Sequence, residues 1–178
     1  MSVLTDGPHF GGSRQDLESA RAAVELPVLR KDFTVSPRDL YDARIMGADA
    51  VLLIVAMLAR DELAELHSLA AELAMAALVE VHDEAELERA LEIGALVVGV
   101  NQRDLHSFEV DGERARRIRT EIPPGVMSIA ESGVDTAAEV AALFEAGFQG
   151  VLVGESLLRS SDKKAAVAGL LGRTVPCG

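Results

Sequence analysis

Short apolar runs alternate with helical patterns along the chain. In these seven runs apolar residues follow one another directly, rather than at every second position, which is typical of parallel strands covered on both faces. The runs are residues 2–5, 27–33, 50–56, 76–82, 96–101, 126–132 and 150–156. The pattern predicts an α/β protein with seven parallel strands.

The segments between the runs carry helix signals. Ser36 followed by Pro37 is typical of a helix N-terminus, because serine caps the first turn and proline suits its first position. Thr136 with Glu139 predicts a capping box at the start of another helix. The residues of that helix expected to face inward are Val140, Leu143 and Phe144.

Glycine precedes an apolar residue just before three of the predicted strands. The pairs are Gly47-Ala48, Gly94-Ala95 and Gly147-Phe148. Their recurrence indicates a repeated strand–helix unit, for which right-handed crossovers are expected. No linker or change of composition divides the chain, so we predict one domain over residues 1–178.

The composition limits the kinds of partner that the protein can bind and the compartment in which it is expected. The chain has 178 residues, of which 49% are hydrophobic, enough for one sizeable core. Its net charge of −12 argues against nucleic acid and anionic membranes as partners. One cysteine, Cys177, argues against a disulfide framework and favours the cytoplasm. We therefore expect a cytoplasmic protein whose partner is a small molecule.

Polar side chains stand at or near the carboxyl ends of four apolar runs: Lys31, Glu80, Asn101 and Glu131. Parallel α/β enzymes build their active sites at this edge of the sheet. Glu80 interrupts an apolar strand and needs a partner, for which Lys31 from two strands away is the candidate. Two interpretations remain open: a structural ion pair, or an acid/base couple.

Two glycine turns lie at the ends of the last two predicted strands, at Ser132-Gly133 and at Gly154-Glu155-Ser156. Glycine allows close approach to a ligand, and backbone N–H groups that open a helix favour anions. The two turns together predict a phosphate site. Arg103 either stabilises its loop or orients a substrate. The four histidines, His9, His67, His82 and His106, show no metal-ligand spacing and are interpreted as surface or capping residues.

At these residues the chain resembles indole-3-glycerol-phosphate synthase. The similar stretches run in the family's order over essentially the whole chain. They include SVLT at 2–5, PHF at 8–10, VLRKDF at 28–33, GADAVLLIV at 47–55, LVEVH at 78–82, GVNQRDL at 99–105, AESG at 130–133 and LVGESL at 152–157.

The resemblance implies a (β/α)8 TIM barrel and a reaction without metal or cofactor. The enzyme would be a carboxy-lyase of tryptophan biosynthesis that closes a pyrrole ring on 1-(2-carboxyphenylamino)-1-deoxyribulose 5-phosphate. Lys31 would be the general acid and Glu80 the base of the dehydration. The other implied roles are orientation of the substrate by Asn101, Glu131 and Ser132, phosphate binding at Gly133, Gly154 and Glu155, and an apolar wall of Phe10, Phe33 and Leu52.

The chain departs from the family pattern at its start. Its first run looks like the family's second strand, so about seven of eight strands are expected, without the glutamate and lysine that the family's first strand carries. Three hypotheses stay open: a fragment of an ordinary enzyme, a barrel completed by another chain or copy through its open edges, or a non-catalytic protein that binds phosphorylated ligands. A related phosphoribosyl isomerase is a further alternative.

Overall fold

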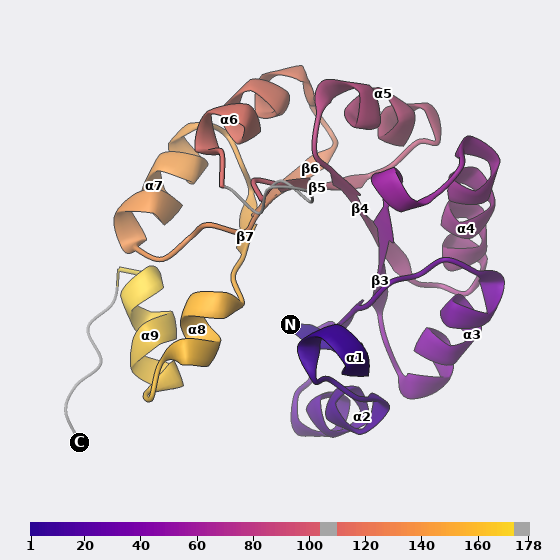
Figure 1. Ribbon diagram of the computed structural model, residues 1–178, viewed down its shortest axis with the longest axis horizontal. Helices are drawn as coiled ribbons and strands as arrows, with labels where there is room; N and C mark the ends of the chain where they lie inside the picture. Colours follow the sequence, from indigo (N-terminus) through magenta and orange to yellow (C-terminus); the bar gives the residue numbers. More distant parts are fainter. Residues whose placement is uncertain (104–109, 173–178) are drawn as a thin grey trace. The chain divides into compact units, whose positions relative to one another are not determined.

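The computed structural model describes residues 1–103 and 110–172, so Cys177, His106 and part of the GVNQRDL stretch lie outside it. Strands and helices alternate along the chain (Figure 1). The strands are β1 (Ser2–Leu4), β2 (Leu29–Lys31), β3 (Ala50–Ile54), β4 (Ala76–Val81), β5 (Val97–Asn101), β6 (Met127–Glu131) and β7 (Gly150–Leu152). The helices are α1 (Gly7–Phe10), α2 (Arg14–Ala23), α3 (Pro37–Met46), the 3₁₀ turn η1 (Val55–Met57), α4 (Arg60–Glu72), α5 (Glu84–Glu92), α6 (Gly112–Glu121), α7 (Ala137–Glu145), α8 (Glu155–Arg159) and α9 (Lys163–Leu170). All seven predicted strands are confirmed, each of them shorter than its apolar run.

The chain forms two compact units. The first comprises Met1–Val81 and Ala85–Val98, and the second comprises His82–Glu84 and Gly99–Gly178. Strands follow chain order within each: β1 to β4 and the start of β5 in the first, then the end of β5, β6 and β7 in the second. The prediction of one domain stays a prediction.

The strand pairs are parallel, as the continuous apolar runs predict. In the first unit Leu4 lies opposite Lys31, and Ile54 lies opposite Glu80. In the second unit Glu131 lies opposite Leu152. Helix α4 packs on β3 and β4 through Leu63 and Leu66, which are fully or almost fully buried. Within each unit the paired strands therefore deliver their carboxyl ends to one edge.

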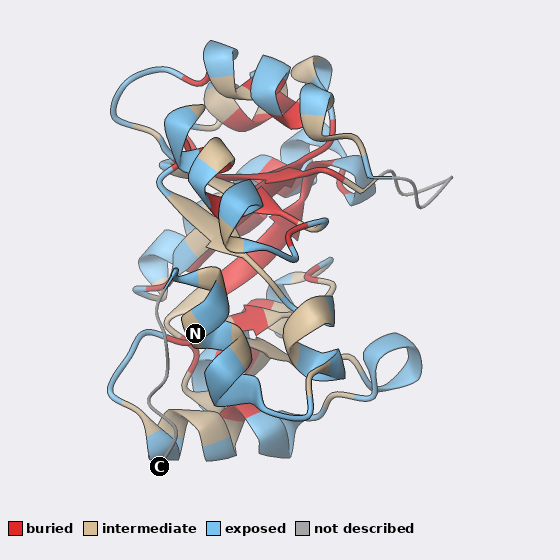
Figure 2. Ribbon diagram, turned by 90° about the vertical axis from the view of Figure 1, so that its left-hand side faces the viewer, coloured by how far each residue is buried: buried red, intermediate tan, exposed pale blue. Residues whose placement is uncertain are grey.

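Burial is concentrated on the strands and on the helix sides that face them (Figure 2). Val140 and Leu143 of α7 are buried, as expected, but the expectation for Phe144 is wrong, because its side chain is 48% exposed. Positions 140, 143 and 144 fall on one face of a helix, so helix periodicity does not account for this exposure, and Phe144 lies at the margin of the buried stripe, one residue before α7 ends. No helix among the described residues has the length and apolar character needed to cross a membrane.

Capping residues set the helix boundaries as the sequence predicts. The Ser36 N–H and hydroxyl donate to Asp39 Oδ2 at 2.9 and 2.8 Å, at the start of α3. At α7 the Glu139 N–H donates to Thr136 Oγ1 at 3.2 Å, and Glu139 Oε2 accepts from the Thr136 N–H at 2.9 Å. These reciprocal bonds satisfy N–H groups that the first helical turn leaves free.

The repeated glycine turn ends helices α3, α5 and α7. Gly47, Gly94 and Gly147 have φ of 90°, 75° and 97°, in the left-handed region. After each glycine, the next residue's N–H donates to a helix carbonyl five residues back, and its side chain is buried. A fourth copy ends α4 at Ala74, with φ 55°, where the Met75 N–H donates to the Ala70 carbonyl at 2.9 Å. The sequence pattern missed this copy because alanine replaces glycine.

We expect Ala74→Gly to raise the free energy of unfolding by about 1 kcal/mol, because left-handed backbone strains every residue with a Cβ. Gly94→Ala is the matched control. A Cβ at Gly94 would meet nothing within 4 Å, so this change adds only the backbone strain and should lower stability by a similar amount. Urea unfolding midpoints would measure both, and shifts in the same direction would contradict the assignment.

Candidate active site

Lys31 is the last residue of β2 and points to the face shared with Leu52 and Glu80. Arg30 lies opposite Val51, so Lys31 is in register with Leu52, and Ile54 lies opposite Glu80. Paired residues of parallel strands point to the same face, and residues two apart on one strand do as well. The register alone therefore directs Lys31 of β2 and Glu80 of β4 to one face, across β3.

The predicted contact between these two residues is present. Lys31 Nζ donates to Glu80 Oε2 at 2.8 Å, and the two side chains are 19% and 2% exposed. The ammonium compensates a carboxylate that would otherwise carry its charge into the core. A pair at this distance can exchange a proton, so the geometry fits both the structural and the acid/base interpretation.

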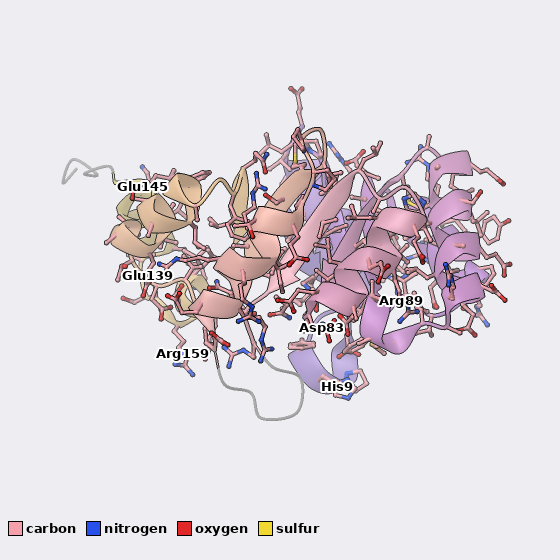
Figure 3. The ribbon with its side chains drawn as sticks, turned by 90° about the horizontal axis from the view of Figure 1, so that it is seen from above. His9, Asp83, Arg89, Glu139, Glu145 and Arg159 are labelled. Carbon is pink, nitrogen blue, oxygen red and sulfur yellow. The ribbon has the colours of Figure 1, made fainter. Side chains whose placement is uncertain are left out.

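Phe10 and Phe33 lie in one aromatic cluster of the first unit. Their ring centroids are 6.4 Å apart, and the His9 ring meets Phe33 edge-on at 5.7 Å. His9 belongs to the short helix α1 (Figure 3), whose N-cap Asp6 accepts from the His9 and Phe10 N–H groups. Phe10 is 57% exposed, whereas Leu52, the third residue predicted for the apolar wall, is 3% exposed and lies within β3.

Sequence reasoning missed a group of polar residues that holds the end of β2. Arg30, 8% exposed, donates from Nε to Thr5 Oγ1 at 3.1 Å and from Nη2 to Asp32 Oδ2 at 2.8 Å. Its Nη1 donates to the Asp39 carbonyl of α3 at 2.7 Å. Arg30 and Asp32 flank Lys31, so they fasten the strand on the opposite face. Opposite charges two residues apart in an apolar run were the available signal.

The second unit presents Asn101 at the end of β5 and Glu131 at the end of β6. Both predicted residues are buried, with Glu131 1% exposed. Asn101 Oδ1 accepts from the Arg103 N–H at 3.0 Å, so part of its role is to shape the loop that follows β5. The Arg103 guanidinium donates to Glu155 Oε2 at 2.9 Å, and Arg159 Nη2 lies 2.7 Å from Glu155 Oε1. Glu155 thus connects Arg103 to α8.

The two predicted glycine turns are linked by a hydrogen bond. Ser156, one residue after Glu155, donates from its hydroxyl to the carbonyl of Val134, the residue after Gly133, at 3.2 Å. A Cβ at Gly133 would lie 2.3 Å from Val110 Cγ1, so only glycine fits there. A Cβ at Gly154 would meet nothing within 4 Å. Gly133 is thus required by packing, whereas Gly154 leaves open space.

The histidines follow the surface interpretation only in part. His9 is exposed, but His82, directly after β4, is 7% exposed, so the surface interpretation is wrong for His82. Burial lowers the pKa of His67 on α4 below its usual value. Among the described residues, no three His, Cys, Asp or Glu side chains converge as metal ligands would.

The helix that follows the Gly133 turn has a pH-dependent cap. The Asp135 and Thr136 N–H groups donate to Glu139 Oε2 at 2.8 and 2.9 Å, and these bonds hold the pKa of Glu139 below its usual value of 4.5. Because the pKa is lower in the folded state, the carboxylate stabilises the fold above the unfolded pKa. This contribution is lost as pH falls through the folded pKa.

We expect the unfolding free energy of Glu139→Gln to fall less than that of the wild type on acidification from about pH 6 to about pH 3. Glu145→Gln is the control, because it removes the same charge from the other end of α7, where the helix dipole disfavours an anion (Figure 3). Thermal unfolding at a series of pH values would measure the difference. Parallel pH profiles for wild type and Glu139→Gln would contradict the assignment.

Comparison with known proteins agrees with this arrangement. The family model for indole-3-glycerol phosphate synthase matches residues 1–170. Two curated relatives named indole-3-glycerol phosphate synthase, from Mycobacteroides abscessus and Mycobacterium ulcerans, are 52% and 50% identical over 171 residues. The match covers 96% of this chain and 63% of each relative.

A solved structure described as native KDPGal superimposes with a TM-score of 0.68 at 16% identity, covering 96% of this chain and 79% of its own. That likeness concerns the fold alone, and with the seven parallel strands it confirms the expected TIM-barrel class. The family model, which matches nearly the whole chain, and the identity to these relatives show that the chain belongs to the indole-3-glycerol phosphate synthase family.

Proposed function

We propose that the protein converts 1-(2-carboxyphenylamino)-1-deoxyribulose 5-phosphate to indole-3-glycerol phosphate, with release of carbon dioxide and water. The observation that carries the proposal is the Lys31–Glu80 contact of 2.8 Å at the carboxyl ends of β2 and β4, in a chain of this family. An ammonium beside a buried carboxylate offers one proton donor and one acceptor, as a condensation followed by a dehydration requires.

The first unit would supply the acid and the base. Lys31 donates a proton to the substrate's ketone oxygen while the ring carbon that bears the carboxylate bonds to the carbonyl carbon. Carbon dioxide then leaves, and its bonding electrons restore the aromatic ring. Glu80 then takes a proton from the methylene carbon bonded to the nitrogen as the ring double bond forms, and passes it across the 2.8 Å contact to Lys31. Lys31 donates that proton to the hydroxyl, which leaves as water, and solvent reprotonates Lys31. Phe10, Phe33 and Leu52 would provide the apolar wall for the anthranilate ring, an aromatic surface suited to stacking.

The remaining predicted residues would orient the rest of the substrate. Its hydroxyl groups would form hydrogen bonds with Asn101, Glu131 and Ser132. The guanidinium of Arg103 is suited to bind a carboxylate. The N–H groups of Gly133, Gly154 and Glu155 would bind the phosphate, and all three residues are exposed. The Ser156–Val134 hydrogen bond supports this assignment, since it couples the two turns.

Turnover of the aminodeoxyribulose phosphate by the purified chain, followed by indole fluorescence, tests the proposal. The chain contains no tryptophan, so its own emission in that window is low. Product formation that saturates with substrate is the expected result. A folded sample that binds phosphate without forming product would instead favour the non-catalytic phosphate-binding alternative. Family membership disfavours the phosphoribosyl isomerase alternative.

Two accompanying proposals concern the cellular compartment of the protein and its association with another chain. The cytoplasm is the proposed compartment, which the acidic composition with one cysteine favours. Association with a second copy or a complementing chain through sheet edges stays a prediction. The mass of the protein in solution, measured by light scattering, would test it.

A further inference from the structure

The turn that follows β6 contains a strained residue. Ser132 has φ 67° and Gly133 has φ 63°, so two consecutive residues adopt the left-handed conformation. Serine carries a Cβ that disfavours this region. Among the described residues, Ala74 is the one other non-glycine with positive φ, and it ends a helix, where such backbone is common. Ser132 instead directly follows the buried Glu131, so neighbouring groups must hold it.

Gln102 makes the holding contacts. Its backbone N–H donates to the Glu131 carbonyl at 2.9 Å, and its side-chain Nε2 donates to the Ser132 carbonyl at 2.8 Å. Its own carbonyl accepts from the Asp111 N–H at 2.8 Å, and the residue is 4% exposed. One buried glutamine thus binds the carbonyls of the two residues that precede Gly133.

This arrangement determines where the Gly133 N–H points. The Ser132 carbonyl and the Gly133 N–H belong to one planar trans peptide, so they point in opposite directions. With the carbonyl directed to Gln102, the N–H is directed away from it. Val110 closes the other side of the glycine, since a Cβ there would lie 2.3 Å from its side chain. Gly133 itself is exposed.

We infer that Gln102 is a positioning residue, which holds the Ser132–Gly133 peptide in the orientation that presents the Gly133 N–H to the substrate phosphate. The inference rests on the proposed phosphate site. Gln102 is an addition to that site. It does not contact the phosphate or interrupt an apolar strand, and the sequence pattern did not indicate it.

Gln149 provides a matched control at the other end of the same strand. Its Oε1 accepts from the Ser128 N–H at 2.8 Å and from the Ser128 hydroxyl at 2.6 Å. Both glutamines therefore fasten β6 through their side-chain amides, Gln149 near its amino end and Gln102 beyond its carboxyl end. Gln149 is exposed whereas Gln102 is buried, so the two variants are compared by phosphate affinity and not by stability.

The experiment compares Gln102→Met and Gln149→Met, which remove the amide at nearly constant side-chain length. We measure the dissociation constant of inorganic phosphate, and KM and kcat for the substrate and for its dephosphorylated form. Gln102→Met is expected to raise the phosphate dissociation constant and KM about tenfold, as loss of one hydrogen bond allows. The penalty should be absent for the dephosphorylated substrate and absent in Gln149→Met.

Phosphate affinity unchanged in Gln102→Met, or an equal penalty on both substrates, would overturn the inference. A wild type that shows no turnover would count against the proposed function alone. The phosphate dissociation constants would still test the role of Gln102. If Gln102→Met does not fold, the wild-type protein is used for an NMR titration instead. Phosphate titration should shift the amide NMR signals of Gly133 and of the Gln102 side chain, and the absence of both shifts would overturn the inference.

Discussion

Lys31→Met is expected to lower kcat by about a thousandfold, within the range that a positioned general acid contributes. Methionine retains the apolar stem and removes the ammonium that lies 2.8 Å from Glu80. Without that donor, negative charge that develops on the substrate's ketone oxygen is left unprotonated. KM should change less than kcat, because the phosphate and the anthranilate ring have other contacts. Steady-state indole fluorescence measures both constants.

The same substitution also affects stability. Glu80 is 2% exposed and would lose the cation that compensates it, which costs about 3 kcal/mol in buried pairs of this kind. The double variant Lys31→Met/Glu80→Gln removes both charges and should recover most of that loss in urea unfolding. It should not recover turnover. Recovery of stability without recovery of activity separates the chemical role of the pair from its structural role.

Arg21→Met is the control for loss of an ion pair. Arg21 Nη1 lies 2.7 Å from Asp49 Oδ2 in the same unit, but Asp49 directly precedes β3 and so stands at the amino ends of the strands. Its loss should leave kcat within about twofold of wild type, since active sites of parallel α/β sheets lie at the opposite edge. A kcat for Lys31→Met as high as that of Arg21→Met would exclude Lys31 as the acid.

Gly12→Ala is expected to lower the free energy of unfolding by about 3 kcal/mol, the upper part of the range for overpacking. A Cβ at Gly12 would lie 2.3 Å from the Leu4 carbonyl oxygen and 2.9 Å from the Thr5 nitrogen. Both are backbone atoms at the end of β1, so no side-chain rotation relieves the clash. The Gly12 N–H also donates to the Asp6 carbonyl at 2.9 Å, so the loop that carries α1 must move.

Displacement of α1 should also affect substrate binding, because Phe10 and His9 meet Phe33 through that loop. Gly7→Ala is the control within the same loop, since its Cβ would lie 3.6 Å from the Gly12 carbonyl oxygen, an ordinary contact. Urea unfolding and KM should change strongly in Gly12→Ala and little in Gly7→Ala. Similar values for the two variants would show that the loop adjusts without cost.

The predicted strands and caps illustrate what one sequence can reveal. Continuous apolar runs indicate buried parallel strands because both faces of such a strand need apolar side chains. Ser36 and Thr136 indicate helix starts because their side chains satisfy nearby N–H groups, a local interaction. The glycine turns are equally local, although alanine at position 74 conceals one of them. Phe144 was misjudged because apolar character alone does not specify how far the buried side of a helix extends.

For the candidate site, residue type and strand-end placement sufficed to select Lys31, Glu80, Asn101 and Glu131, since each is a polar residue at or near the carboxyl end of an apolar strand. The partners of Arg30 and Gln102 were not predictable in the same way. Arg30 meets Thr5 and Asp39 from other segments, and Gln102 reaches Ser132 thirty residues away. Such contacts depend on register and on the path of loops, which no local pattern encodes.

By itself, then, the sequence determined the class of fold, the order of its strands and the residues able to carry acid/base chemistry, because these follow from local periodicity and side-chain type. The tertiary structure alone decided which polar groups meet. It directed Lys31 to Glu80 across β3, fastened the opposite face of β2 through Arg30, and turned the Ser132 carbonyl toward Gln102. The physical reason is that strand register and chain crossings set distances between residues far apart in sequence, and hydrogen bonds form only over a few ångströms.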